Sequence, residues 1–150
     1  MKNIFKSEVC EEIIERINQL TVTSQTLWGK MNVAQMLAHC NVTYELVFEN
    51  KHPKPNALLR LILKLFVKNV VVNEKPFKRN SQTAPAFIIA TEKDFEIEKA
   101  RLKAYIDQVQ KLGSAYFDGK ESHSFGVLKA TEWNAMFYKH LDHHLNQFGV

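Results

Sequence analysis

Three of the six histidines lie close together near the end of the chain, at positions 140, 143 and 144. His140 and His144 are four residues apart, so on a helix their side chains lie one turn apart on the same face. Two imidazole nitrogens in this arrangement can bind one metal ion, as they do in the His-x-x-x-His pairs of helical zinc sites. The pair therefore predicts a metal site on the last helix.

The direction of these side chains follows from the helical period. At about 100° per residue, His144 falls between Trp133 and Phe137, and His140 falls beside Trp133. Both imidazoles are therefore expected to point toward the interior of the protein. His143 is rotated by about 60° from His140 on the same reckoning, so we expect it at the rim of the site, as a candidate for proton transfer.

A third ligand is expected from an earlier helix. His39 lies near the edge of an apolar stripe formed by Met36, Cys40 and Thr43, so it should also face inward. Three neutral imidazoles would leave coordination positions open for water or substrate, as in catalytic metal sites. Zinc, nickel and iron, and also copper, accept such ligands. The alternative is that His39 is a core histidine satisfied by hydrogen bonds. Two other helices could also separate it from the last helix.

The remaining reactive residues are weaker candidates. His123 lies in the loop before the last helix, where it could line a cleft and, like His143, is a candidate for proton transfer. His52 is expected to be solvated in a proline-rich loop. Cys10 and Cys40 are expected to pack in the core. The sequence has no phosphate-binding glycine loop, no Gly-x-Ser-x-Gly elbow and no Cys-x-x-Cys pair, which argues against those classes of enzyme.

Helical spacing of apolar residues dominates the chain and predicts an all-α fold, in which a bundle buries the one-sided helices as a single domain over residues 1–150. Ser7, Asn32 with Gln35, Thr91 and Thr131 are the expected N-caps. Gly113 is the expected end of one helix. The expected helices cover residues 7–19, 32–50, 57–71, 91–113 and 132–148, with a long connection over residues 73–90.

The segment 57–72 is apolar, with Arg60, Lys64 and Lys68 on one face. We expect a core helix with a basic, solvated edge. On this interpretation Leu58, Leu61, Ile62, Leu65 and Phe66 face the core. A helix on a membrane surface is the alternative, whereas a spanning helix needs about 20 mostly uncharged residues.

The composition limits the cellular compartment and the classes of binding partner that we expect. Hydrophobic residues make up 45% of the chain, enough for one core, and the net charge of +4 is too weak to predict a nucleic-acid partner. Two cysteines are too few for a disulfide scaffold, and the first residues lack the apolar stretch of a signal peptide. We therefore expect a cytoplasmic protein with neither a nucleic-acid nor a membrane partner.

Two motifs resemble those of the DinB/YfiT-like superfamily. Asn32-Val-Ala-Gln-Met-Leu-Ala-His39 is similar to its second-helix motif, and His140-Leu-Asp-His-His144 with Gln147-Phe148-Gly149 is similar to its last-helix motif. Phe125-Gly126 and Glu132-Trp133 further resemble a branch of unknown function. The resemblance implies a four-helix bundle with one long crossover connection, a divalent metal ion bound by His39, His140 and His144, and a possible homodimer.

The resemblance also implies a class of activity. Members include transferases that use bacillithiol or mycothiol, maleylpyruvate isomerases of the same kind, and metal-dependent hydrolases. We therefore expect a metal-dependent enzyme that activates a water or thiol for transfer or hydrolysis of a small molecule, with a low-molecular-weight thiol as a possible second cofactor. The alternative is a non-enzymatic, stress-related protein that binds a metal or small molecule, with residues 73–90 as a lid.

Overall fold

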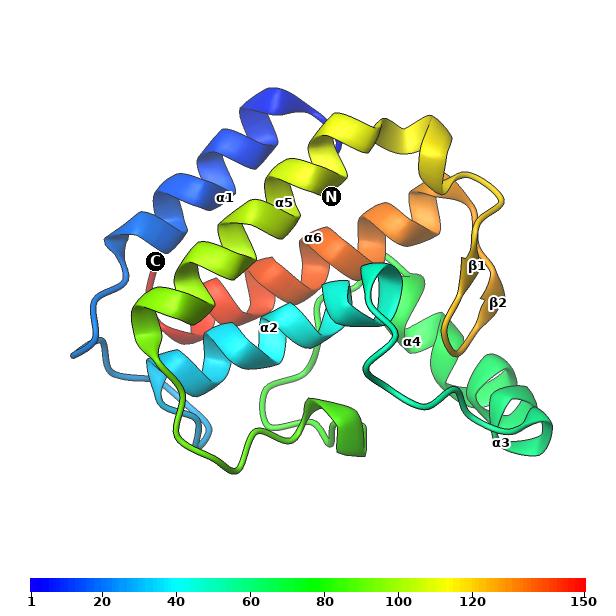
Figure 1. Cartoon of the computed structure of the whole chain (residues 1–150), viewed down its shortest axis with the longest axis horizontal. Helices are drawn as coiled ribbons and strands as arrows, with labels where there is room; N and C mark the ends of the chain where they lie inside the picture. Colours follow the sequence, from blue (N-terminus) through cyan, green and yellow to red (C-terminus); the bar gives the residue numbers. More distant parts are fainter.

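The computed structural model describes all 150 residues and confirms the predicted all-α fold. Four long helices, α1 (Ser7–Gln19), α2 (Val33–Phe48), α5 (Phe95–Phe117) and α6 (Ala130–Gln147), pack together as a bundle (Figure 1). The long crossover from α2 to α5 holds α3 (Ala57–Ile62), a π-helical turn η1 (Leu63–Val67), α4 (Lys68–Val72) and a 3-10 turn η2 (Pro85–Phe87). A short antiparallel hairpin of β1 (Glu121–Ser122) and β2 (Gly126–Val127) precedes α6.

The beginning of α2 is the helix end that the sequence predicts best. The Asn32 side chain accepts a hydrogen bond from the Gln35 amide, and the Gln35 side chain accepts one from the Asn32 amide. This reciprocal pair satisfies two of the amides that a helix leaves unpaired at its N-terminus. It fixes the first turn of the helix that carries His39.

The other predicted caps are wrong in detail. The bounds of α1 agree with the prediction, but Lys6 is the N-cap and the Ser7 hydroxyl instead donates to Glu11. Helix α5 begins at Phe95 rather than near Thr91, because Asp94 accepts a hydrogen bond from the Ile97 amide and so caps the helix itself.

The two remaining boundaries also differ. Gly113, with φ 70° and ψ 170°, interrupts α5 rather than ending it, and the helix resumes as far as Phe117, whose ring is fully buried. Helix α6 starts at Ala130, because Glu132 accepts a hydrogen bond from the amide of Lys129. Thr131 is therefore within α6 and is not its cap.

Aromatic side chains fill the centre of the bundle. The Phe137 ring lies 5.2 Å from Tyr44, 5.4 Å from Phe117 and 5.5 Å from Trp133, measured between ring centroids. All four side chains are almost completely buried. This cluster packs α6 against α2 and α5, and it therefore sets the distance between the helices that carry the histidines.

A buried polar network also joins α2 to α5. Asn41 donates to both the carboxylate and the carbonyl of Glu98, and Arg101 pairs with Glu98 and Glu45. His52 binds Glu45 as well, at 2.8 Å, so it is half-buried rather than solvated as expected. Although burial raises the pKa of Glu45, its bonds to Arg101 and His52 lower it further, and the carboxylate stays charged.

The expected helix over residues 57–71 is present as α3, η1 and α4, but its expected place in the core is wrong. No residue of α3, η1 or α4 is buried, and the apolar side chains that should have faced the core are exposed. The least exposed positions lie instead on the side of Arg60 and Lys68, which turn toward the bundle. None of the helices has both the length and the apolar character needed to cross a bilayer.

Replacing Phe137 with alanine tests the aromatic centre. We expect a loss of about 3–5 kcal/mol in the free energy of unfolding, because a fully buried ring is removed and a cavity is left. Urea unfolding followed by circular dichroism measures it. Phe66→Ala is the control, because Phe66 is 74% exposed and its loss should change stability by less than about 0.5 kcal/mol. Equal effects of the two substitutions would contradict this description of the core.

Candidate metal centre

The structure brings together the three histidines that the sequence selects. His39 comes from α2, and His140 and His144 come from adjacent turns of α6. One ring nitrogen of each lies within 4.8 Å of the others, and the closest pair, the Nε2 atoms of His39 and His140, is 2.9 Å apart. His39 and His144 are buried, whereas His140 is partly exposed. The cluster contains no carboxylate or thiol.

The orientation of His39 is fixed by the crossover. Its Nδ1 lies 2.8 Å from the carbonyl oxygen of Phe87 in η2. A carbonyl oxygen only accepts, so Nδ1 must carry the proton and donate it. In the neutral ring the other nitrogen, Nε2, then holds a free lone pair, which points into the cluster.

The orientation of His144 is fixed by two successive hydrogen bonds. The Gln147 side chain donates from Nε2 to the carbonyl oxygen of Trp28 at 2.7 Å. This bond turns Gln147 Oε1 toward His144, where it accepts from Nδ1 at 2.7 Å. The chain of donors and acceptors therefore leaves the lone pair of His144 on Nε2, as in His39.

His140 is held by Thr43, whose hydroxyl oxygen lies 2.9 Å from Nδ1. The facing Nε2 of His39 carries a lone pair and accepts a hydrogen bond. The neutral His140 ring therefore donates from its own Nε2, and its Nδ1 accepts from the Thr43 hydroxyl. A hydroxyl can equally accept, so a rotation of this one O–H lets His140 take the same tautomer as its two neighbours. Thr43 is thus compatible with a lone pair on all three Nε2 atoms.

All three imidazoles are held in the neutral form that a metal ion requires. Burial lowers the pKa of His39 and, together with the neighbouring histidines, lowers that of His140 well below its ordinary value. Burial and the proximity of His39 lower the pKa of His144 to about 3. No proton needs to be removed from these rings near neutral pH before they bind an ion.

The donor set fits a divalent transition metal. Three nitrogens at about 2.1 Å from one zinc ion are about 3.0–3.5 Å apart, which small side-chain rotations reach from the observed spacing. Each ring has its second nitrogen bonded to a neighbour, an arrangement that orients metal-binding histidines and raises their basicity. The Phe87 ring lies 5.2 Å from His39 and 5.7 Å from His140 and forms one wall of the cluster.

His143 lies outside the cluster, as the helical period predicts. Its ring packs between Trp28 and Phe77, at 5.9 and 5.8 Å, and lies 5.0 Å from the ring of His144. Burial and the positive charge of Arg79 lower its pKa, against the opposing effect of Asp142. His143 is therefore a neutral, half-buried base at the edge of the cluster.

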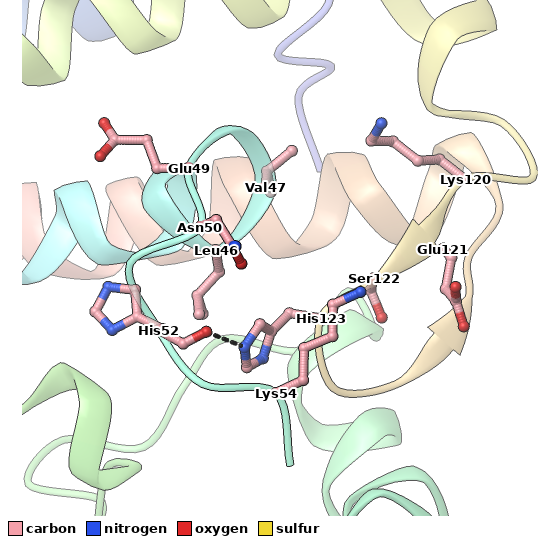
Figure 2. A pocket seen from close by; sticks show the side chains of 10 residues that line it. All are labelled: Leu46, Val47, Glu49, Asn50, His52, Lys54, Lys120, Glu121, Ser122 and His123. Carbon is pink, nitrogen blue, oxygen red and sulfur yellow. Dashed lines mark hydrogen bonds between the residues drawn. The ribbon is translucent and has the colours of Figure 1, made fainter. Parts of the chain in front are cut away.

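His123 is not part of this site. Figure 2 shows it in a separate, mostly polar pocket, where its ring faces the carbonyl oxygen of His52 at 3.3 Å. Its other nitrogen binds Ser124. The pocket lies between the end of α2 and the hairpin of β1 and β2, and none of the three clustered histidines lines it.

Sequence reasoning missed the four partners of the imidazoles. Gln147 was detectable, because it lies three residues after His144 on the same helical face. Thr43 lies on the predicted stripe of α2, but an apolar stripe predicts packing and not a hydrogen bond to a histidine. The carbonyls of Trp28 and Phe87 belong to irregular segments, and no side-chain pattern identifies them.

The family described as "Protein of unknown function (DUF1569)" matches residues 4–149, which is almost the whole chain. No curated protein and no solved structure matches.

Replacing Thr43 with valine tests the role of this hydroxyl. Valine keeps the shape but removes the partner of His140 Nδ1, so we expect zinc affinity to fall by about 10–100-fold. Titration against a chromophoric chelator measures the affinity, and circular dichroism checks the fold. Thr43→Ser keeps the hydroxyl and should bind zinc nearly as tightly as the unaltered protein. Unchanged affinity in Thr43→Val would show that the hydroxyl does not position His140.

Proposed function

We propose that this chain, which belongs to the DUF1569 family, is a divalent-metal-dependent enzyme acting on a small molecule. One observation carries the proposal: hydrogen bonds to Phe87 and Gln147 turn the Nε2 lone pairs of His39 and His144 toward His140. Core histidines usually direct their nitrogens at separate polar partners. Three converging nitrogens in neutral rings are instead what a metal ion requires.

The proposed chemistry follows from the coordination positions that three histidines leave open on a metal ion. A bound divalent ion supplies Lewis acidity, which lowers the pKa of a water or thiol and yields a nucleophile near neutral pH. Three imidazole ligands leave coordination positions on such an ion for the water or thiol and for a small molecule. Transfer and hydrolysis both use such a nucleophile, and a low-molecular-weight thiol as cosubstrate would select transfer.

His143 is the residue that we assign to proton transfer. Its ring is neutral at pH 7, half-buried and next to His144, so a ring nitrogen can take up a proton from a nucleophile at the cluster. His123 has no part in this proposal, because its ring bonds to Ser124 and His52 in the separate pocket.

The surroundings favour a substrate with a negative charge. Arg79 forms no ion pair, and its guanidinium lies 4.1 Å from the centre of the Trp28 ring, which in turn contacts His143. Phe77 packs against the other side of His143. A free cation on one of the two aromatic rings that flank His143 suits a carboxylate or phosphate attached to an apolar group.

We also propose a superfamily and a cellular location for this protein. Placement of His39 on the second long helix and of His140 and His144 on the last, with a long crossover between α2 and α5, supports assignment to the DinB/YfiT-like superfamily. Cys10 and Cys40 are free and buried, which supports a cytoplasmic setting.

Metal analysis of untagged protein, purified without chelators, tests the proposed function. We expect about one divalent ion per chain, retained by His123→Gln and lost from His140→Gln while the helical circular dichroism signal persists. Turnover of ester, amide and thiol-transfer substrates should be lost together with the metal. A protein that takes up no divalent ion under any condition would exclude the proposal, and bound metal without any turnover would favour a binding protein.

Titration with benzoate tests the preference for anions. Benzoate should bind the metal-loaded protein, and Arg79→Gln should weaken this binding by about 10–100-fold, because a charge-assisted hydrogen bond contributes about 1.5–3 kcal/mol. Arg79→Lys should retain part of the affinity, and neutral benzyl alcohol should not distinguish the variants. Calorimetry at low salt measures these affinities. Benzoate binding that is insensitive to Arg79→Gln would contradict this role.

A further inference from the structure

The first half of the crossover is an amphipathic helical segment with its apolar side turned outward. Its exposed fractions reach 69% at Leu58, 52% at Leu61, 43% at Ile62, 64% at Leu65, 74% at Phe66 and 57% at Val70. We call these six side chains the outer apolar face. A contiguous exposed patch of large apolar side chains usually marks an interaction surface.

Ion pairs and hydrogen bonds hold this segment in its orientation. Arg60 pairs with Glu121 of the hairpin, and Lys68 pairs with Glu132 of α6 at 2.8 Å. At the end of α4, the buried ammonium group of Lys139 donates to the carbonyl oxygens of Val70 and Asn73. These three contacts attach the segment to the rest of the protein. Its apolar side therefore faces outward.

The charged residues of this part of the crossover are mostly basic. Residues 51–75 contain six basic residues and a single acidic one, Glu74. Lys54, Lys64 and Lys75 are exposed and form no ion pair, so this part of the chain carries three free cations close in sequence to the apolar side chains. A partner for this surface must therefore combine an apolar layer with negative charge.

The shape and the charge together select the partner. A second copy of the chain would bring its own basic segment against this one, and the like charges would repel. The segment also lies at one end of the molecule, where α3 projects away from the four long helices (Figure 1), and its apolar side chains are exposed there. Apolar side chains exposed in this way can enter the boundary between headgroups and acyl chains.

We propose that the outer apolar face docks on the surface of an anionic lipid bilayer, with Phe66 and its apolar neighbours inserted and Lys54, Lys64 and Lys75 at the headgroups. This departs from the expectation of no membrane partner, which assumed that the same side chains were buried. The proposal does not depend on the metal centre.

Co-sedimentation with vesicles tests the proposal. The full chain should bind vesicles of phosphatidylcholine with phosphatidylglycerol at low salt, and binding should weaken as salt is added or when the vesicles contain phosphatidylcholine alone. The double variant Leu65→Ser, Phe66→Ser should lose more than about tenfold of this affinity, because the inserted side chains are removed. Replacing Lys54, Lys64 and Lys75 with glutamine should reduce binding and its salt dependence together.

Val22→Ser is the matched control, because Val22 is as exposed as Leu58, at 69%, but lies in the connection between α1 and α2. It should bind the anionic vesicles normally. No binding to anionic vesicles at low salt would overturn the proposal. Sedimentation velocity tests whether the face instead binds a second copy of the chain. If the unaltered protein is a dimer, the Leu65→Ser, Phe66→Ser variant is a monomer and neither binds vesicles, the face joins two copies.

Discussion

The candidate site depends on one constraint, which is that buried imidazoles can point their lone pairs at one another only when their remaining nitrogens are bonded elsewhere. Two backbone carbonyl oxygens impose this constraint. The carbonyl of Phe87 accepts directly from His39, and the carbonyl of Trp28 acts on His144 through Gln147. Because a carbonyl oxygen cannot donate, neither ring is free to reverse its tautomer without leaving a buried polar group unpaired, which costs about 1–3 kcal/mol. The fold therefore prepares the nitrogens before any ion arrives.

The three histidines were predictable because helix geometry is local. A spacing of four residues places His140 and His144 on one face, and the neighbouring Trp133 and Phe137 indicate that this face is buried. His39 followed from the apolar stripe of α2 in the same way. Their partners were not predictable. Phe87 lies 48 residues from His39 along the chain, and Trp28 lies 119 residues from Gln147. Both contribute backbone atoms, whose positions depend on how irregular segments fold against the finished bundle.

The error over residues 57–72 has a different physical origin. Periodicity correctly separated Arg60, Lys64 and Lys68 from the apolar side chains, but an amphipathic pattern does not state which side meets the protein. The usual assumption is that burial of apolar area decides. Here the bundle already has a filled aromatic centre, and the surface beneath the segment presents Glu121 and Glu132. Ion pairs with these carboxylates, together with the bonds from Lys139, decide the orientation instead.

Helix α6 connects these two features of the structure. Within nine residues, Lys139 holds the end of α4, His140 contacts α2 through Thr43, His143 packs against Phe77 of the crossover, and Gln147 binds the connection before α2. These contacts lie at helical spacings, so a rotation of α6 would break all of them at once. Because one helix carries both the metal-binding pair and the anchor of the crossover, the tautomers of the imidazoles and the outward turn of the apolar segment follow from the same placement of α6 in the bundle.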